Sequence, residues 1–314
     1  MSIVGFEMKF SKPASTYEEQ LSILRKRGLG VNNPASALHY LSHLNYYRLT
    51  AYWLPFQEQS SPRQFHKGTD FEDVVNLYVF DREFRLLLLD AIERIEVSFR
   101  TAWAYYMAHR YGSHAYLDPG LAKRSSWHVK NLASLKKEIS RSDEVFIEHY
   151  QQTCCEPETP PVWAVCEVMS LGLLSRWVNQ LPPGDVSQIA SIYGLDQSVM
   201  RSTLQHITYV RNLCAHHSRV WNRRLTVTMK VPNRKPAEVA AVVNPASPRN
   251  IYNTLTMLAY LLDKISPGHT WRQRLGKLLA SHDVDTQQMG FLPNWQAQPF
   301  WVGALQEMQP GSHL

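Results

Sequence analysis

A long stretch without glycine or proline is the feature that most constrains the fold of this 314-residue chain. From Thr69 to about Ala108 neither residue occurs, although both commonly interrupt helices. Hydrophobic side chains recur through the stretch at steps of three and four residues: Val75, Tyr78, Val79, Phe84, Leu88, Ala91, Ile92, Ile95 and Phe99. This spacing is typical of an amphipathic helix. Because the stretch is unusually long, we expect one long helix or two helices joined by a bend.

Helical signals also dominate the rest of the chain. Thr16–Glu19 and Thr69–Glu72 have the pattern of capping boxes, and Asn33-Pro34 has the pattern of a helix start. Further helices are expected at about residues 127–139, 143–151, 162–180, 185–193, 198–217, 249–264 and 270–281. Leu225–Val231 alternates between apolar and polar residues and suggests a short strand or extended arm. The sequence therefore predicts an all-α fold with peripheral helices and one short extended arm.

The chain shows no internal repeat and no Gly/Ser-rich linker, which favours one domain over two independent ones. Within that domain we expect an N-terminal helical region over residues 1–66 and a helical core over 67–282. An irregular C-terminal tail is expected over residues 283–314, packed by its aromatic side chains.

Composition limits the classes of protein and of site. Hydrophobic residues make up 44% of the chain, so a substantial core is expected rather than disorder. No C-x-x-C pair occurs among the four cysteines, Cys154, Cys155, Cys166 and Cys214. This argues against a zinc site or a disulfide framework, and we expect no metal and no cofactor. Met1–Lys12 lacks the apolar run of a secretory signal, and no apolar run approaches the ~20 residues that span a bilayer. A cytoplasmic protein without a membrane span is therefore expected.

Charge is distributed unevenly along the chain. The net charge of +6 admits a polyanionic partner but does not require one. Between Gln197 and Ala237 there is no Asp or Glu. The same segment holds eight cationic residues: Arg201, Arg211, Arg219, Arg223, Arg224, Lys230, Arg234 and Lys235. Such a segment suits a surface that faces phosphates, and the alternative is an ordinary solvated basic face.

An arginine and a histidine lie close together in this acid-free segment, in the sequence Arg211-Asn212-Leu213-Cys214-Ala215-His216. Arginine binds phosphate through a planar fork of donors, and histidine moves protons near neutral pH. On a straight helix Arg211 and His216 would be about 140° apart and would not share a face. A site that uses both therefore requires the helix to bend or end there, or a second copy to complete it across a two-fold axis.

A purely structural interpretation of the motif also stands. An R-x4-H pattern occurs often by chance. Arg211 could form a salt bridge with Glu93 or Glu96. Glu96 could instead pair with Arg100, which lies one helical turn later.

Further segments carry a family resemblance. After the motif come Ser218-Arg219 and Trp221-Asn222-Arg223, and other matching pieces lie along nearly the whole chain: Lys12–Ala14, Asn45–Leu49, Phe80–Arg85, Asp90–Val97, Phe146–Tyr150, Trp163–Ser170 and Met289–Phe291. Over about residues 8–301 these segments resemble the Abi_2 family, which contains the AbiD and AbiF-like abortive-infection proteins of bacteria.

The resemblance implies a HEPN-like helical bundle, a fold whose R-x4-6-H motif is shared by many RNA-cleaving toxins and antiphage effectors. Carried onto this chain, the catalytic residues are Arg211, Asn212 and His216. The resemblance adds an acidic residue from a preceding helix, for which Glu96 or Glu93 is the candidate. One motif per chain favours a homodimer with a shared cleft. AbiF-like relatives are associated with small non-coding RNAs, so a cognate RNA is an expected partner.

These expectations combine into a metal-independent endoribonuclease that acts in antiphage defence. The alternative is a non-catalytic protein that binds a structured small RNA. A third version joins the two, with bound RNA keeping a toxic nuclease silent until infection.

The expected RNA-binding residues come from two regions. Around the motif they are substrate-gripping or structural: His217, Arg219, Arg223 and Arg224. In the N-terminal region Tyr47 and Arg48, together with Tyr46 and Trp53, could stack on unpaired bases. The alternative is that these aromatic residues belong to the core.

Overall fold

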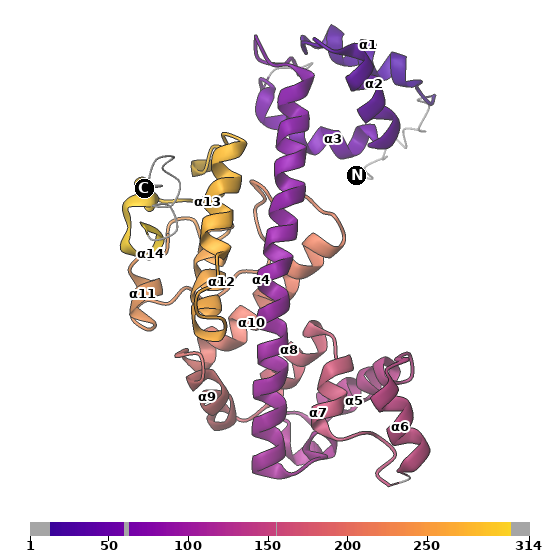
Figure 1. Ribbon diagram of the computed structural model, residues 1–314, viewed down its shortest axis with the longest axis vertical. Helices are drawn as coiled ribbons and strands as arrows, with labels where there is room; N and C mark the ends of the chain where they lie inside the picture. The colour runs from indigo at the N-terminus through magenta and orange to yellow at the C-terminus, as the bar shows by residue number, and fades with distance from the viewer. Residues whose placement is uncertain (1–12, 60–62, 155, 303–314) are drawn as a thin grey trace, which may run out of the picture. The chain divides into compact units, whose positions relative to one another are not determined.

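Fourteen α-helices and five short 3-10 helices make up the regular structure of residues 13–59, 63–154 and 156–302, which the computed structural model describes (Figure 1). These described residues contain no strand, and their extended pairings are two isolated bridges. The predicted all-α class is confirmed.

Helix α4 (Phe71–Tyr111) crosses the boundary between two compact units, Met1–Phe80 and Asp81–Leu314. It is one helix of 41 residues, so the first of the two expectations for the Gly/Pro-free stretch is confirmed. The prediction of a single domain stays a prediction.

The first unit contains α1 (Tyr17–Lys26), α2 (Pro34–His43), α3 (Tyr46–Trp53) and the start of α4. The predicted capping box begins α1: the Thr16 hydroxyl accepts from the Glu19 N–H (3.2 Å), and the Glu19 carboxylate accepts from the Thr16 N–H (2.7 Å). The core of this unit includes apolar side chains that are at most 2% exposed: Leu24, Ala37, Leu41, Leu49, Tyr52, Trp53, Phe71, Val74 and Phe80.

The start of α4 differs by one residue from the sequence prediction. The pattern predicts Thr69 as the cap with Glu72 as its partner, whereas Asp70 is the capping residue in the structure. The Asp70 carboxylate accepts from the N–H of Glu72 (3.2 Å), and Asp73 accepts from the N–H of Asp70 (2.8 Å). Thr69 stays outside the helix because its carbonyl accepts from the N–H of Gly30 (2.9 Å), which pairs this backbone with another segment.

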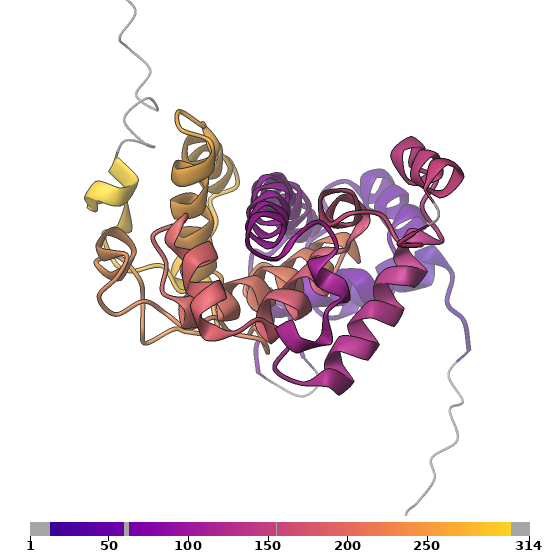
Figure 2. The ribbon, with the colours of Figure 1, turned by 90° about the horizontal axis from the view of Figure 1, so that it is seen from below.

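The second unit contains the rest of α4 and ten further helices. They are α5 (Ser125–Ile139), α6 (Val145–Thr153), α7 (Val162–Val168), α8 (Leu171–Gln180), α9 (Pro183–Ser191), α10 (Gln197–Ala215), α11 (Ala237–Ala240), α12 (Tyr252–Ile265), α13 (Trp271–Ser281) and α14 (Pro299–Val302). Helix α10 packs on α8 and α9, and α5 packs on α7 and α8. Figure 2 views α4 end-on, with α12 and α13 beside it on one side and α5 and α6 on the other.

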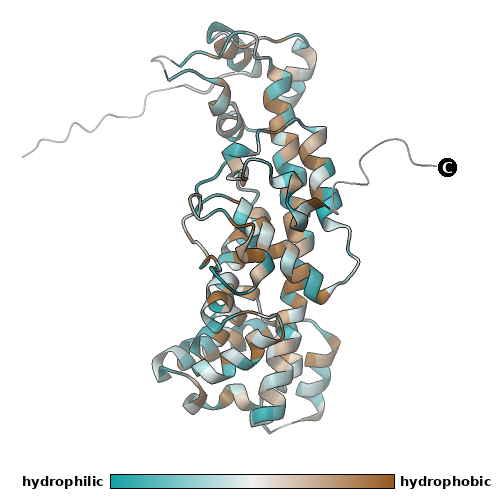
Figure 3. Cartoon of the chain, turned by 90° about the vertical axis from the view of Figure 1, so that its left-hand side faces the viewer, coloured by the Kyte–Doolittle hydropathy of each residue, from teal (hydrophilic) through white to brown (hydrophobic). Residues whose placement is uncertain are grey.

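Residues 81–111 of α4 are held by side chains from helices distant in the sequence. The indole N–H of Trp271 on α13 donates to the carbonyl of Leu87 (2.8 Å). The ring of Tyr193, which follows α9, lies 4.4 Å from the ring of Phe99. Helix α12 is buried on all sides from Tyr252 to Leu262, which is typical of a helix at the centre of a core. Figure 3 shows hydrophobic and hydrophilic residues mixed along the helices.

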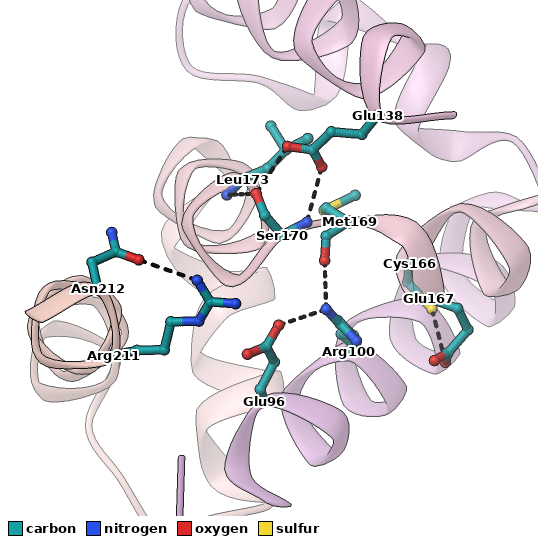
Figure 4. Close-up of polar contacts among 10 residues, drawn as sticks. All are labelled: Glu96, Arg100, Glu138, Cys166, Glu167, Met169, Ser170, Leu173, Arg211 and Asn212. Atoms are coloured by element: carbon teal, nitrogen blue, oxygen red, sulfur yellow. Dashed lines mark hydrogen bonds and ion pairs between the residues drawn. The ribbon is translucent and has the colours of Figure 1, made fainter. Parts of the chain in front are cut away.

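One helix predicted over residues 162–180 is wrong, because α7 and α8 are separate. The chain leaves the helical conformation at Met169 and Ser170, and Ser170 becomes the N-cap of α8. Glu138 accepts from both the N–H and the hydroxyl of Ser170 (2.9 Å each), and Arg100 donates to the carbonyl of Met169 (2.7 Å) (Figure 4). These contacts compensate the helical hydrogen bonds that the break removes.

Three C-terminal segments also refine the prediction. Leu225–Val231 forms neither helix nor strand, and its first N–H donates to the carbonyl of Arg249 (2.8 Å). The expected loop over Lys235–Pro248 contains α11. The expected irregular tail contains α14 within its described part, and residues 303–314 lie outside the described residues.

Candidate functional site at the end of helix α10

Helix α10 presents the Arg–His motif at its C-terminal end. It begins after Asp196, whose carboxylate accepts from the N–H of Ser198 (2.8 Å). Hydrogen bonds from Ser198 hold the pKa of Asp196 below its ordinary value. One face of the helix is at most 4% exposed: Val199, Met200, Thr203, Leu204, His206, Ile207, Val210 and Cys214. Burial of this face fixes the rotation of the helix, so Arg211 and Asn212 are exposed.

The helix ends inside the motif, which is one of the geometries that the sequence requires for a shared site. His216 caps the helix, and His217 follows with a φ of 56°. The N–H of Ser218 donates to the carbonyl of Leu213 (2.9 Å), and the N–H of His217 donates to that of Cys214 (3.0 Å). This pair of hydrogen bonds is a Schellman motif, in which glycine usually occupies the position that His217 holds.

A buried ion pair on α4 holds the segment that follows this turn. Asp81 is 0% exposed and forms an ion pair with Arg85. One oxygen of the Asp81 carboxylate also accepts from the N–H groups of Val220 (3.0 Å) and Trp221 (2.6 Å). Asp81 is therefore an acidic residue beneath the motif's turn, and sequence reasoning missed its role. Its signal was weak, because Asp81 occurs among several charged residues of α4.

The predicted acidic partners on α4 have other surroundings. Glu96 accepts from Arg100 (2.5 Å), as their spacing predicts. The guanidinium of Arg211 lies 3.4 Å from the amide oxygen of Asn212 and extends toward the side of α4 that carries Glu96 (Figure 4). Among the described residues no ion pair joins Arg211 to Glu96 or to the exposed Glu93. A role for either glutamate in the site stays a prediction.

The cationic residues of the acid-free segment have two kinds of environment. Arg201 is structural, because it donates to the carbonyls of Val178 (3.1 Å), Asn179 (2.5 Å) and Leu181 (2.9 Å) at the end of α8. Burial lowers the pKa of Arg201. Arg219 and Arg223 are half-buried, and the other basic residues from the motif onward are exposed: Arg211, His216, His217, Arg224, Lys230, Arg234 and Lys235.

Tyr209 is a candidate functional residue that sequence reasoning missed. Burial raises its pKa, but hydrogen bonds with Thr226 and the charge of Arg223 outweigh this and bring the pKa below 10.0. The N–H of Thr226 donates to the Tyr209 hydroxyl (3.4 Å), and Arg223 also donates to the carbonyl of Arg219 (3.3 Å). Two predicted RNA-binding arginines are thus gathered near α10. Tyr209 belongs to no sequence motif, so the sequence did not indicate its contacts with Thr226 and Arg223.

The motif's own cysteine has a structural environment. Burial and then the charge of Asp81 raise the pKa of Cys214 to about 12, so its thiol stays protonated. Among the described residues no group of three or more His, Cys, Asp or Glu side chains is placed to hold a metal ion. The motif exposes an imidazole, that of His216, and a guanidinium, that of Arg211.

The predicted RNA-binding residues of the N-terminal region lie on α3 in the first unit. Tyr47 is 74% exposed, and Arg48 is also exposed. Trp53 is 2% exposed and its ring lies 5.0 Å from that of Tyr46, so the core interpretation is correct for Trp53. A groove of about 1070 Å³ is lined by Arg27, Tyr46 and Tyr47 together with other residues of this unit.

Comparison with known families places the chain. The model of the Abi-like protein family (Abi_2) matches residues 39–222, more than half of the 314 residues. The chain belongs to the Abi-like protein family. The matched region runs from α2 through α10 and ends one residue after the backbone that Asp81 holds. Searches of curated proteins and of solved structures found no match.

Membership in the Abi-like family makes this an abortive-infection-type protein. The family match covers the whole Arg211–His216 motif. The HEPN-type chemistry, the RNA partner and the dimer remain predictions. In the described part of the chain, no helix combines the length and the apolar character needed to cross a membrane.

Proposed function

We propose that this Abi-like protein is an antiphage effector that cleaves RNA at the end of α10 without a metal ion. The observation that carries the proposal is the end of the helix inside the motif. Because α10 stops at Ala215, Arg211 lies near the end of the helix and His216 is its C-cap, so both exposed side chains stand just before the left-handed turn at His217. The turn lies in a segment that contains no acidic residue to compete with phosphate.

The proposed reaction uses the RNA's own 2′-hydroxyl as the nucleophile. His216 removes the proton from this hydroxyl or donates one to the leaving 5′-oxygen, a contribution typically of ~10²–10⁴-fold. Arg211 stabilises the charge that develops on the phosphorane through its forked donors. Asn212, whose amide oxygen is 3.4 Å from Arg211, orients that guanidinium. The O–P bond to the 5′-oxygen breaks, leaving a 2′,3′-cyclic phosphate and a 5′-hydroxyl.

A homodimer would supply the two histidines that the two proton transfers need. The motif occurs once per chain and supplies one exposed His216, whereas the reaction needs both a base and an acid. A two-fold axis beside the turn would bring a second His216 and a second Arg211 into one cleft.

The surrounding cations suit the RNA backbone. Arg224 and His217 are exposed next to the turn, and the cluster around Tyr209 holds Arg223 in place. Phosphate contacts of this kind position RNA without reading its sequence. In the first unit the exposed Tyr47 ring offers a face on which an unpaired base can stack.

The test is to incubate the purified protein with single-stranded RNA in EDTA and to map the product ends. We expect 2′,3′-cyclic phosphate and 5′-hydroxyl ends from the wild type, and no cleavage of DNA of the same sequence. The His216→Ala variant should lose the activity and keep its melting temperature, because His216 is exposed. Full activity in His216→Ala, or activity that EDTA abolishes, would overturn the proposal.

The alternative function is a non-catalytic RNA-binding protein. It is favoured by the exposed cations that continue past the motif, at Lys230, Arg234 and Lys235, because they grip phosphate whether or not cleavage follows. RNA binding that survives His216→Ala, with no cleavage by the wild type, would favour this alternative. A nuclease silenced by its bound RNA would be toxic when expressed without that RNA, and Arg211→Ala would relieve the toxicity.

A further inference from the structure

A pocket between α6 and α7 lies on elements that the proposed ribonuclease site does not use. Its volume is about 390 Å³, within the ~300–1,000 Å³ range of ligand pockets. Phe146, Tyr150 and Trp163 contribute aromatic walls, and Glu167 and Cys154 also line it.

The aromatic walls are open to solvent. Trp163 is 56% exposed and Phe146 is 39% exposed. The Tyr150 hydroxyl donates to the carbonyl of Pro157 (2.8 Å), so its polar end is already bound and its ring is left to line the pocket. Val145, next to Phe146, is 78% exposed. Large apolar side chains that are exposed next to one another often mark a binding site.

The charge around this pocket is opposite to that of the whole chain. Between Arg141 and Arg176 there is no lysine or arginine, although the protein has a net charge of +6. The same segment contains six acidic residues: Asp143, Glu144, Glu148, Glu156, Glu158 and Glu167. Within the described residues, Glu158 is the one of the six that forms an ion pair, with Lys136 (3.3 Å). The segment that forms the pocket is therefore acidic, which favours a cationic partner over nucleic acid.

Glu167 is the acidic group that lines the pocket itself. Its carboxylate accepts from the Cys166 thiol at 3.7 Å (Figure 4). Burial and the charge of Glu167 raise the pKa of Cys166 to about 12. The Cys166 thiol is therefore neutral and adds no second negative charge beside Glu167. An aromatic wall beside an exposed carboxylate is an arrangement that binds an organic cation.

We propose that this pocket binds a lysine or arginine side chain presented by a segment of a protein partner. The cation would lie against the rings of Trp163 and Phe146 and pair with Glu167. The apolar surface continues past the pocket at Val145, which gives the residues on either side of the cation something to contact and favours a peptide segment over a small amine.

The test uses Cys154, an exposed thiol at the pocket, as an anchor. Two short disulfide-bearing peptides are compared, one with arginine and one with its neutral isostere citrulline at the same position. Each peptide is attached to Cys154 by disulfide exchange, in the presence of increasing concentrations of 2-mercaptoethanol, which competes by reducing the bond. The full chain carries Cys155→Ser so that one thiol of the pair reacts, and mass spectrometry measures the modified fraction. We expect the arginine peptide to withstand at least tenfold more 2-mercaptoethanol than the citrulline peptide.

Three variants distinguish binding in the pocket from a general attraction between the cationic peptide and the acidic segment. Glu167→Gln and Trp163→Ala should each reduce the arginine peptide to the level of the citrulline peptide. Glu148→Gln removes the same charge from α6 outside the pocket lining and should leave the preference within threefold. Both Glu167 and Trp163 are exposed, so unchanged melting temperatures check that these variants fold.

Three results would overturn the proposal. The first is equal attachment of the arginine and citrulline peptides. The second is attachment of cystamine, a small diamine disulfide, as strong as that of the arginine peptide, which would assign the pocket to a small cation. The third is a dimer that dissociates on Glu167→Gln, which would assign it to a second copy of the chain. The first two results do not bear on RNA cleavage, and the third concerns only where two copies of the chain meet. RNA cleavage in EDTA is measured separately, so failure of this proposal and failure of the proposed function can be told apart.

Discussion

Asp81 connects the long helix to the backbone that follows the motif. A carboxylate at 0% exposure would be costly if it were alone, and here Arg85 and the N–H groups of Val220 and Trp221 all bind it. Its effect on the site is indirect, since it holds the chain just after His216 and His217 and touches neither Arg211 nor the proposed substrate.

The Asp81→Ala variant should lose about 3–5 kcal/mol of unfolding free energy, because it removes the buried carboxylate that binds Arg85 and the N–H groups of Val220 and Trp221. Urea denaturation of the purified chain measures this loss. The same change at the exposed Glu93 on the same helix should stay within about 0.5 kcal/mol. Equal stability of the two variants would show that Asp81 is not an anchor.

His217 has a left-handed backbone conformation, so glycine should be more stabilising than alanine at this position, the reverse of their usual order in a helix. Glycine is normally less stable than alanine inside a helix by roughly 0.5–1 kcal/mol. At a φ of 56°, the Cβ of alanine is the unfavourable feature, so His217→Gly should be more stable than His217→Ala by about 1 kcal/mol. Comparing these two variants removes the side-chain contacts of His217 from the result.

The control is the same comparison two residues earlier. At Ala215, the last residue of α10, replacement by glycine should destabilise the chain. Thermal or urea unfolding of the variants gives both differences. A His217→Ala variant at least as stable as His217→Gly would contradict the observed turn.

His206, which is buried in α10, makes the stability of the folded chain depend on pH. Its Nδ1–H donates to the carbonyl of Val227 (2.7 Å), and its Nε2 lies 2.7 Å from the Thr254 hydroxyl. Burial lowers the pKa of His206 below 6.5 in the folded chain, so the unfolded chain binds a proton more readily. Stability is therefore full above pH 6.5 and falls as the pH drops from there toward the folded pKa.

Unfolding free energies measured between pH 7.5 and pH 5.5 should show this loss, with a slope of at most about 1.4 kcal/mol per pH unit from His206. Burial also lowers the pKa of His269, which acts in the same direction. His206→Gln should therefore make the slope shallower without abolishing it. An unchanged slope in this variant would remove His206 as a cause.

At the scale of elements, hydrophobic periodicity located the helices well and their ends less well. The Gly/Pro-free stretch predicted α4. The break between α7 and α8 was missed because its local signals, Ser170 and Gly172, are weak ones that also occur inside helices. What produces it is tertiary: Glu138 binds Ser170, and Arg100 binds the carbonyl of Met169.

The Ser170→Ala variant tests this tertiary origin. It removes an N-cap hydroxyl that also donates to Glu138 (2.9 Å), so the chain should lose about 1–2 kcal/mol of unfolding free energy. Ser187→Ala in α9 is the matched control, because its hydroxyl only donates to the carbonyl of Pro183 within its own helix. That variant should be neutral or slightly more stable, since alanine is the better helix former.

The candidate site was predicted only in part, for a physical reason. The identities of Arg211, Asn212 and His216 follow from the motif and the family resemblance. The end of the helix was one of several open geometries, because a left-handed histidine in place of glycine gives no clear stop signal. Asp81 and Tyr209 act through long-range contacts, which periodicity does not report.

At the scale of the whole molecule, two sequence segments of opposite charge lie in the second unit. The acid-free segment carries the motif, and the acidic segment between Arg141 and Arg176 carries the aromatic pocket. A polyanion such as RNA suits the first, and a cationic protein segment suits the second. Separate surfaces of this kind would let an abortive-infection protein hold RNA and a protein partner at the same time.

The central claim is that His216 moves the protons in a metal-independent cleavage of RNA. The most direct measurement is the rate of RNA cleavage in EDTA by the wild type and by His216→Ala, each shown to have the same melting temperature. We expect the variant to cleave RNA about 10²–10⁴-fold more slowly than the wild type. Equal rates, or a wild-type rate that EDTA removes, would contradict it.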